Sequence, residues 1–155
     1  MKNMTILGVG EKIAFVSFPY LALTIYAGIR FPATFKFGDL PYSLLLGTGC
    51  ALMVIGLVLN FASAVTMIRA FNSKKLLTTG TYAFCRNPMY ASFILLTIPG
   101  LALALNSWLV MTTSLIMYMA LKVFIKGEED YLMQQFGSQF AEYKKNVGLV
   151  VPRII

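Results

Sequence analysis

The chain contains no histidine, and only six of its 155 residues are acidic. Histidine ligates many metal and haem centres and is a common general base, so its absence excludes sites that depend on imidazole. The only thiols belong to Cys50 and Cys85. We expect these two residues at opposite membrane faces, too far apart for a disulfide. Any acid–base or ligand-binding chemistry must therefore use side chains other than histidine.

Charge is scarce as well, since 12% of residues are charged and 58% are hydrophobic. The mean hydropathy is +0.74. A water-soluble chain of this length cannot bury so much apolar surface, so the solvent for most of the protein is lipid. We therefore expect one integral membrane domain over residues 1–155, built only from helices.

Four apolar segments, residues 13–29, 44–68, 89–105 and 108–124, are about long enough to cross a bilayer. The last two belong to one uncharged run of about 35 residues, which as a single helix would be about 50 Å long. We predict that this run folds into a helical hairpin turning at Asn106–Ser107, with a kink at Pro99. Glycines in the second segment predict close helix packing, and Asn60 predicts an interhelical hydrogen bond.

Residues 128–147 differ from the other segments because they are too polar to span. One apolar stripe at helical spacing runs through them, formed by Leu132, Phe136, Phe140, Tyr143 and Val147. We predict a C-terminal amphipathic helix over about 128–147 that covers a polar site on the membrane surface. Gly137 is the expected position of a bend.

The net charge of +7 comes from basic residues at the ends of apolar segments, which favours contact with lipid headgroups rather than nucleic acid. With four spans, both termini share one side, and by the positive-inside rule this side is cytoplasmic, in a cell inner membrane. Eleven of the thirteen basic residues fall there: Lys2, Lys12, Arg69, Lys74, Lys75, Arg86, Lys122, Lys126, Lys144, Lys145 and Arg153.

Two polar clusters interrupt the apolar sequence on this side. Residues 76–90, LLTTGTYAFCRNPMY, are here called the island, and residues 127–130, GEED, form the second cluster. Arg86 offers a fork of donors, whereas Glu128 and Glu129 offer carboxylates. Facing one another, these groups suit a ligand with an amine, a carboxylate and ribose hydroxyls. The alternative is a juxtamembrane loop with topology and helix-capping roles.

The island, the apolar hairpin and EEDYLMQQFGSQFAEYKKNV resemble the isoprenylcysteine carboxyl methyltransferase family and the related phospholipid methyltransferases. The resemblance covers residues 76–152. It implies methyl transfer from S-adenosylmethionine to a lipophilic acceptor in the bilayer, namely a carboxylate, amine or thiol. The cofactor-binding residues that it implies are Leu76, Leu77, Gly80, Tyr82, Asn87, Pro88, Met89, Tyr90 and Glu128.

The same resemblance assigns catalytic roles to Arg86 and Glu129. Members with a prenylated substrate often carry histidine where this chain has Asn87, and a basic residue where it has Phe124, which weighs against prenylcysteine as the acceptor. Lys122 and Lys126, on either side of Phe124, are the predicted substrate-binding residues. The alternative functions are a non-catalytic membrane subunit or scaffold and, less favoured, a four-span transporter. Such transporters need an ionisable residue inside the membrane to bind cations, and the only charged residue in the four segments is Lys122, near the end of the last one.

Overall fold

The computed structural model describes residues 9–73 and 76–153. In these residues the long helices are α1 (Gly10–Arg30), α3 (Tyr42–Ser73) and α6 (Trp108–Phe136). Between α3 and α6 lie the 3₁₀ turn η1 (Gly80–Ala83), α4 (Pro88–Ser92), the π-helical segment η2 (Phe93–Thr97) and α5 (Ile98–Ala104). The short helices α2 (Pro32–Phe35) and α7 (Ser138–Asn146) complete the described elements. No named strand occurs among them.

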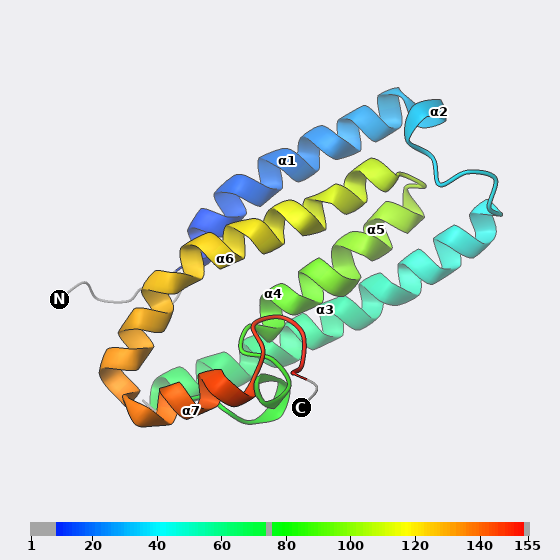
Figure 1. Cartoon of the computed structure of the whole chain (residues 1–155). Helices are drawn as coiled ribbons and strands as arrows, with labels where there is room; N and C mark the ends of the chain where they lie inside the picture. The colour runs from blue at the N-terminus through cyan, green and yellow to red at the C-terminus, as the bar shows by residue number, and fades with distance from the viewer. Residues whose placement is uncertain (1–8, 74–75, 154–155) are drawn as a thin grey trace.

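The helices form a row in which α1 packs along α6, α6 along α5, and α5 along α3 (Figure 1). Three of them, α1, α6 and residues Tyr42–Arg69 of α3, are long and apolar enough to cross a membrane. The predicted fourth span corresponds to the shorter apolar segment Pro88–Ala104. Large apolar side chains point outward from the row, as Phe15 and Phe61 do with exposed fractions of 83% and 72%. The expectation of an all-α membrane protein is confirmed.

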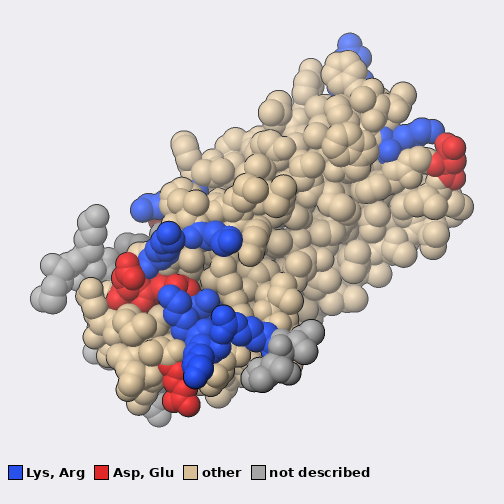
Figure 2. Space-filling view, in the orientation of Figure 1, with Lys and Arg blue, Asp and Glu red and all other residues tan. Residues whose placement is uncertain are grey.

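Charged side chains gather at the two ends of the molecule, with a wide uncharged band between them (Figure 2). Arg30, Lys36 and Asp39 belong to the end near α2, where Lys36 pairs with Asp39 at 3.0 Å. The opposite end carries the island, the start of α1 and the C-terminal segments (Figure 1). The predicted separation of basic residues therefore holds for the described residues, whereas Lys2, Lys74 and Lys75 lie outside them.

Glycines let α3 approach the α5 side of the hairpin closely. A Cβ atom at Gly49 would lie 2.5 Å from the carbonyl oxygen of Gly100, and one at Gly56 would lie 2.5 Å from Oγ1 of Thr97. Asn60 of the same helix donates to the carbonyl of Met89 at 3.2 Å and to Ser92 Oγ at 3.3 Å. The glycines and Asn60 therefore serve helix packing, as their pattern predicts.

We expect Gly49→Ala to lower stability by about 1–3 kcal/mol, because backbone atoms of the opposing helix occupy the space that the methyl group needs. Gly47→Ala is the matched control, since a Cβ there meets no atom within 4 Å. Thermal unfolding of the two variants in the same detergent measures the difference. Equal unfolding temperatures would show that the α3–α5 crossing relaxes without cost.

The hairpin turns at the predicted position. Asn106 has a positive φ of 47°, a conformation that asparagine tolerates better than most residues, and α6 begins two residues later. Pro99 lies at the start of α5, directly after η2. Because proline has no amide hydrogen to continue an α-helical ladder, the π-helical segment forms before it. The predicted kink therefore takes the form of a π-helical interruption.

The C-terminal helix differs from the prediction. No new helix begins at residue 128, because α6 continues through the charged cluster to Phe136. Glutamate and lysine are good helix formers and a single glycine costs only about 1 kcal/mol, so the polar sequence does not end the helix. The break occurs instead at Gly137, where φ is 51°, and α7 starts at Ser138. At about 43 Å, α6 is longer than a hydrocarbon core of about 30 Å, so its C-terminal part projects beyond the bilayer.

Candidate active site

The island folds as an extended stretch followed by two short helices. Residues 76–79 lead into Gly80, whose positive φ of 64° suits glycine and begins the turn of η1. Pro88 then opens α4 at a first-turn position that proline tolerates. This path carries Arg86 and Asn87 between two fixed turns, at the end of the helix row that bears most of the charge.

The C-terminal residues 147–151, here called the strap, lie against the island. Cys85 and Gly148 form an isolated parallel β-bridge. The amide of Arg86 donates to the carbonyl of Gly148 at 2.8 Å, and the amide of Asn87 donates to that of Leu149 at 3.1 Å. Val150 is buried in the same core cluster as Cys85. The strap therefore fixes the backbone of the motif residues Arg86 and Asn87.

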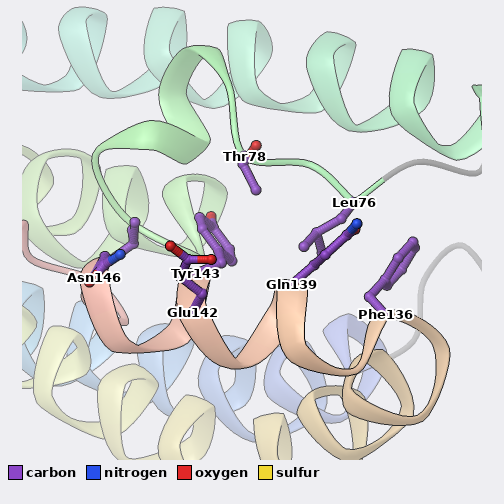
Figure 3. Close-up of a pocket in the computed structure, with 8 residues that line it drawn as sticks. Leu76, Thr78, Phe136, Gln139, Glu142, Tyr143 and Asn146 are labelled. Carbon is purple, nitrogen blue, oxygen red and sulfur yellow. The ribbon is translucent and has the colours of Figure 1, made fainter.

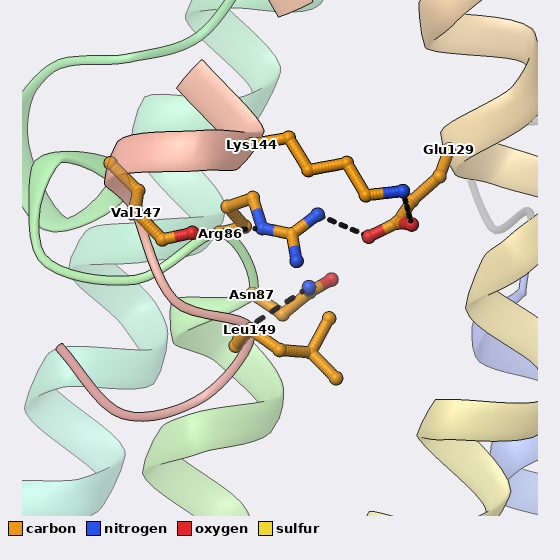
Figure 4. Close-up of polar contacts among 6 residues, drawn as sticks. All are labelled: Arg86, Asn87, Glu129, Lys144, Val147 and Leu149. Carbon is orange, nitrogen blue, oxygen red and sulfur yellow. Dashed lines mark hydrogen bonds and ion pairs between the residues drawn. The ribbon is translucent and has the colours of Figure 1, made fainter. Parts of the chain in front are cut away.

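Figure 4 shows the charged cluster that joins the island to α6 and α7. The Arg86 guanidinium contacts the Glu129 carboxylate, and Lys144 Nζ lies 2.6 Å from the second oxygen of that carboxylate. Arg86 Nε also donates to the carbonyl of Val147 at 3.1 Å. The side chains of Arg86 and Glu129 are each only 13% exposed. The two polar clusters of the sequence thus meet at this ion pair.

Tyr82 and Tyr143 form a second connection between the island and α7. The Tyr143 hydroxyl donates to the carbonyl of Tyr82 at 2.7 Å. Burial, and after it the negative charge of Glu128, raises the pKa of the Tyr82 phenol, which keeps this phenol protonated at neutral pH. Burial raises the pKa of Tyr143 to about 12. Glu128 therefore acts electrostatically on the island from its place on α6.

A cleft of about 700 Å³ lies between the start of the island and α7 (Figure 3). This volume is within the range of small-molecule sites. Of the predicted cofactor-binding residues, Leu76 alone lines it. The complete lining consists of Leu76, Thr78, Phe136, Gln139, Glu142, Tyr143, Asn146 and Val147.

The other predicted cofactor-binding residues lie along the island and on α6. Pro88 is buried, whereas Tyr82, Asn87, Met89, Tyr90 and Glu128 are half-buried. Asn87 Nδ2 donates to the Leu149 carbonyl at 3.4 Å, so this amide is engaged with the strap. Leu77 is half-buried and Gly80 is exposed. No contact with a ligand tests their roles, which stay predictions.

Lys122 and Lys126, the predicted substrate-binding residues, are both exposed on α6. The Lys122 ammonium lies 5.6 Å from the centre of the Tyr118 ring. The lysine that joins Arg86 and Glu129 is instead Lys144 of α7. Sequence reasoning missed Lys144 and the strap, although the apolar stripe correctly placed Tyr143 against the island.

The similarity of this chain to known proteins extends over the segments that carry the island and the second polar cluster. The family described as phospholipid methyltransferase matches residues 44–139, which run from α3 through the island to the start of α7. A protein-S-isoprenylcysteine O-methyltransferase of Saccharomyces cerevisiae is 29% identical over 115 residues, covering 68% of this chain and 48% of that protein. Protein-S-isoprenylcysteine O-methyltransferase B of Arabidopsis thaliana is 26% identical over 113 residues, covering 67% and 57%.

A third relative, protein-S-isoprenylcysteine O-methyltransferase of Tribolium castaneum, is 28% identical over 115 residues, which is 68% of this chain and 41% of that protein. The chain thus spans about half the length of the curated relatives it matches. The family match covers more than half of the chain and includes both polar clusters. The chain belongs to the phospholipid methyltransferase family.

Proposed function

We propose that this protein is a membrane methyltransferase that moves a methyl group from S-adenosylmethionine to a lipophilic acceptor. The observation that carries the proposal is the contact between Arg86 and Glu129, which joins the two polar segments of the family match at one end of the helix row. A scaffold protein requires no such assembly of half-buried charged groups. The site is built where lipid-facing helices meet water.

The residues present fit the proposed cofactor. S-adenosylmethionine carries an amine and a sulfonium, which favour a nearby carboxylate, together with a nucleoside that needs an apolar cleft. Glu128 supplies a half-buried carboxylate whose charge reaches Tyr82, and the adjacent cleft has a volume of about 700 Å³. Tyr82, Asn87, Pro88, Met89 and Tyr90 of the island remain the proposed neighbours of the cofactor.

When bound, the cofactor supplies an electrophilic methyl group for in-line displacement. The contribution of the protein is to hold the acceptor in line with that group and to exclude water. Arg86 and Glu129 compensate each other's charge, and this geometry favours a role in positioning the island. A carboxylate or thiolate acceptor needs no base, whereas an amine acceptor must lose a proton, for which Glu129, a tyrosine or water is the candidate.

The acceptor is proposed to arrive through the lipid. Val123, between Lys122 and Phe124 on α6, is 64% exposed, which is typical of a surface that faces acyl chains. Lys122 and Lys126 flank this surface near the proposed end of the bilayer, where they would meet an acceptor's polar head. The related proteins are named for isoprenylcysteine, but the acceptor of this chain is assigned only as lipophilic. We place the site on the cytoplasmic side of a cell inner membrane, with both termini, from the distribution of basic residues.

Glu128→Gln tests the proposed function. The variant removes the negative charge but keeps the shape, and losing a charged partner costs about 1.5–3 kcal/mol, or roughly 10- to 150-fold in affinity. We therefore expect weaker binding of S-adenosylmethionine by calorimetry of the full chain in detergent. Glu11→Gln, an equally conservative change at an exposed position of α1, is the control and should bind as the unmodified protein does.

A second experiment, on membranes rather than in detergent, identifies the acceptor. Membranes containing the protein are incubated with methyl-labelled S-adenosylmethionine, and labelled lipophilic products are sought by mass spectrometry. Loss of labelling in Glu128→Gln but not in Glu11→Gln supports the assignment. A protein that binds no S-adenosylmethionine, with or without membranes, would be a non-catalytic subunit, and the proposed function would fail.

A further inference from the structure

The polar face of α7 lines the cleft, although none of its residues is among the predicted cofactor-binding, catalytic or substrate-binding residues. Gln139, Glu142 and Asn146 lie three and then four positions apart, so they occupy one side of the helix. All three line the cleft, and Figure 3 shows them on the side of α7 that faces the extended start of the island. The side chains of all three residues are exposed, so the water-facing side of α7 forms one wall of an open cleft.

The remaining walls of the cleft are apolar or flat. Leu76 comes from the island, and Phe136 and Tyr143 come from the end of α6 and from α7 (Figure 3). The Thr78 hydroxyl and the two amides add neutral hydrogen-bonding groups, whereas Glu142 brings the single carboxylate of the lining. Aromatic and aliphatic walls beside a carboxylate match a purine base attached to a sugar with two adjacent hydroxyls, since a carboxylate is a strong acceptor for ribose hydroxyl donors.

The cleft also adjoins the group of residues proposed to bind the cationic end of the cofactor. Tyr143 lines the cleft, and its hydroxyl donates to the carbonyl of Tyr82 at 2.7 Å. Tyr82 is in turn the residue on which the charge of Glu128 acts. Tyr143 therefore belongs to both regions, so a single ligand with a nucleoside at one end and an amine at the other has neighbouring sites for both parts.

We propose that the cleft between the island and α7 is a nucleoside-binding site in which Glu142 accepts hydrogen bonds from the ribose hydroxyls, with Gln139 and Asn146 as neighbouring polar contacts. This inference rests on the proposed function, because the nucleoside is that of the methyl donor. It assigns α7 a direct part in binding, beyond covering the island. Glu142, outside the segment that matches the family, becomes a ligand-binding residue.

The test compares adenosine with 2′-deoxyadenosine as competitors of S-adenosylhomocysteine, measured by calorimetry on the full chain in detergent. The unmodified protein is expected to bind adenosine about 10-fold more tightly than the deoxy compound. Glu142→Gln should weaken adenosine and S-adenosylhomocysteine by about 10-fold, weaken 2′-deoxyadenosine less because it has lost one of the two hydroxyl donors, and leave methionine unchanged. Glu11→Gln, which alters an exposed carboxylate of α1, should change none of these affinities.

The outcomes separate the inference from the proposed function. Equal affinities for adenosine and 2′-deoxyadenosine in the unmodified protein would overturn the ribose contact, even if the Glu142 variant failed to fold. Unchanged nucleoside binding in Glu142→Gln, together with weakened S-adenosylhomocysteine in Glu128→Gln, would overturn the cleft while the proposed function stands. A protein that binds neither S-adenosylhomocysteine nor adenosine would overturn both.

Discussion

Arg86→Ala is expected to destabilise the island by about 3 kcal/mol and to abolish methyl transfer. The substitution leaves Glu129, of which 13% is exposed, with Lys144 as its remaining cationic contact in the described structure. Removing one member of a buried pair typically costs about 3–5 kcal/mol, and partial access to water places this pair at the lower end. The Val147 carbonyl also loses its donor. The α7 and strap segments should therefore separate from the island.

Thermal unfolding and methyl transfer are measured on the same detergent preparation, with Arg30→Ala as the control. Arg30 is an exposed arginine in the last turn of α1, at the opposite end of the molecule. Arg86→Lys should recover only part of the loss, since lysine keeps the charge but cannot contact Glu129 and Val147 with one planar fork. Equal stability of the two alanine variants would mean that the ion pair contributes nothing.

A double-mutant cycle assigns the energy to the pair itself. If Arg86 acts through Glu129, then Glu129→Gln in the Arg86→Ala background should cost much less than Glu129→Gln alone. The coupling of neighbouring charged groups is typically about 0.5–3 kcal/mol. Additive effects would assign Arg86 a role that does not pass through Glu129, such as the direct catalytic role predicted from the family resemblance.

The sequence predicts the helical part of the fold well because lipid imposes simple rules. An uncharged run too long for one bilayer must turn, and the polar pair Asn106–Ser107 near its middle marks the turn, where Asn106 adopts a positive φ that asparagine tolerates. The end of α6 is harder to predict, since charged residues after residue 124 are as helical as the apolar ones before them. Periodicity marks the apolar stripe correctly, but it does not show where one helix ends and the next begins.

Only part of the candidate site can be predicted from the sequence. The sequence predicts that the two polar clusters meet at one membrane face, but it does not predict that Arg86 pairs with Glu129. Nor does it predict the contact of Lys144 with Glu129, which depends on the chain reversal at Gly137. After that reversal, the side of α7 that faces the island is set by backbone angles that spacing does not reveal. The strap leaves still less signal, because a bridge of one residue pair, Cys85 with Gly148, has no repeat.

Gly148→Ala is expected to release the strap from the island. A Cβ at Gly148 would lie 2.0 Å from the carbonyl oxygen of Val151, a backbone atom that cannot move without opening the turn. Opening it removes the hydrogen bonds from the amides of Arg86 and Asn87 and exposes Val150. Two hydrogen bonds and one buried valine are together worth about 3–5 kcal/mol.

The loss is local, so amide hydrogen exchange is the measurement that resolves it. Exchange at Arg86 and Asn87 should accelerate about 100-fold or more in Gly148→Ala, since each 1.4 kcal/mol of local stability is worth about tenfold. Gly47→Ala, where the added methyl group meets no atom within 4 Å, should leave the same two amides unchanged. S-adenosylmethionine should bind more weakly to the Gly148 variant because its island is no longer fixed. Normal exchange at both amides in this variant would show that the strap does not hold Arg86 and Asn87 in place.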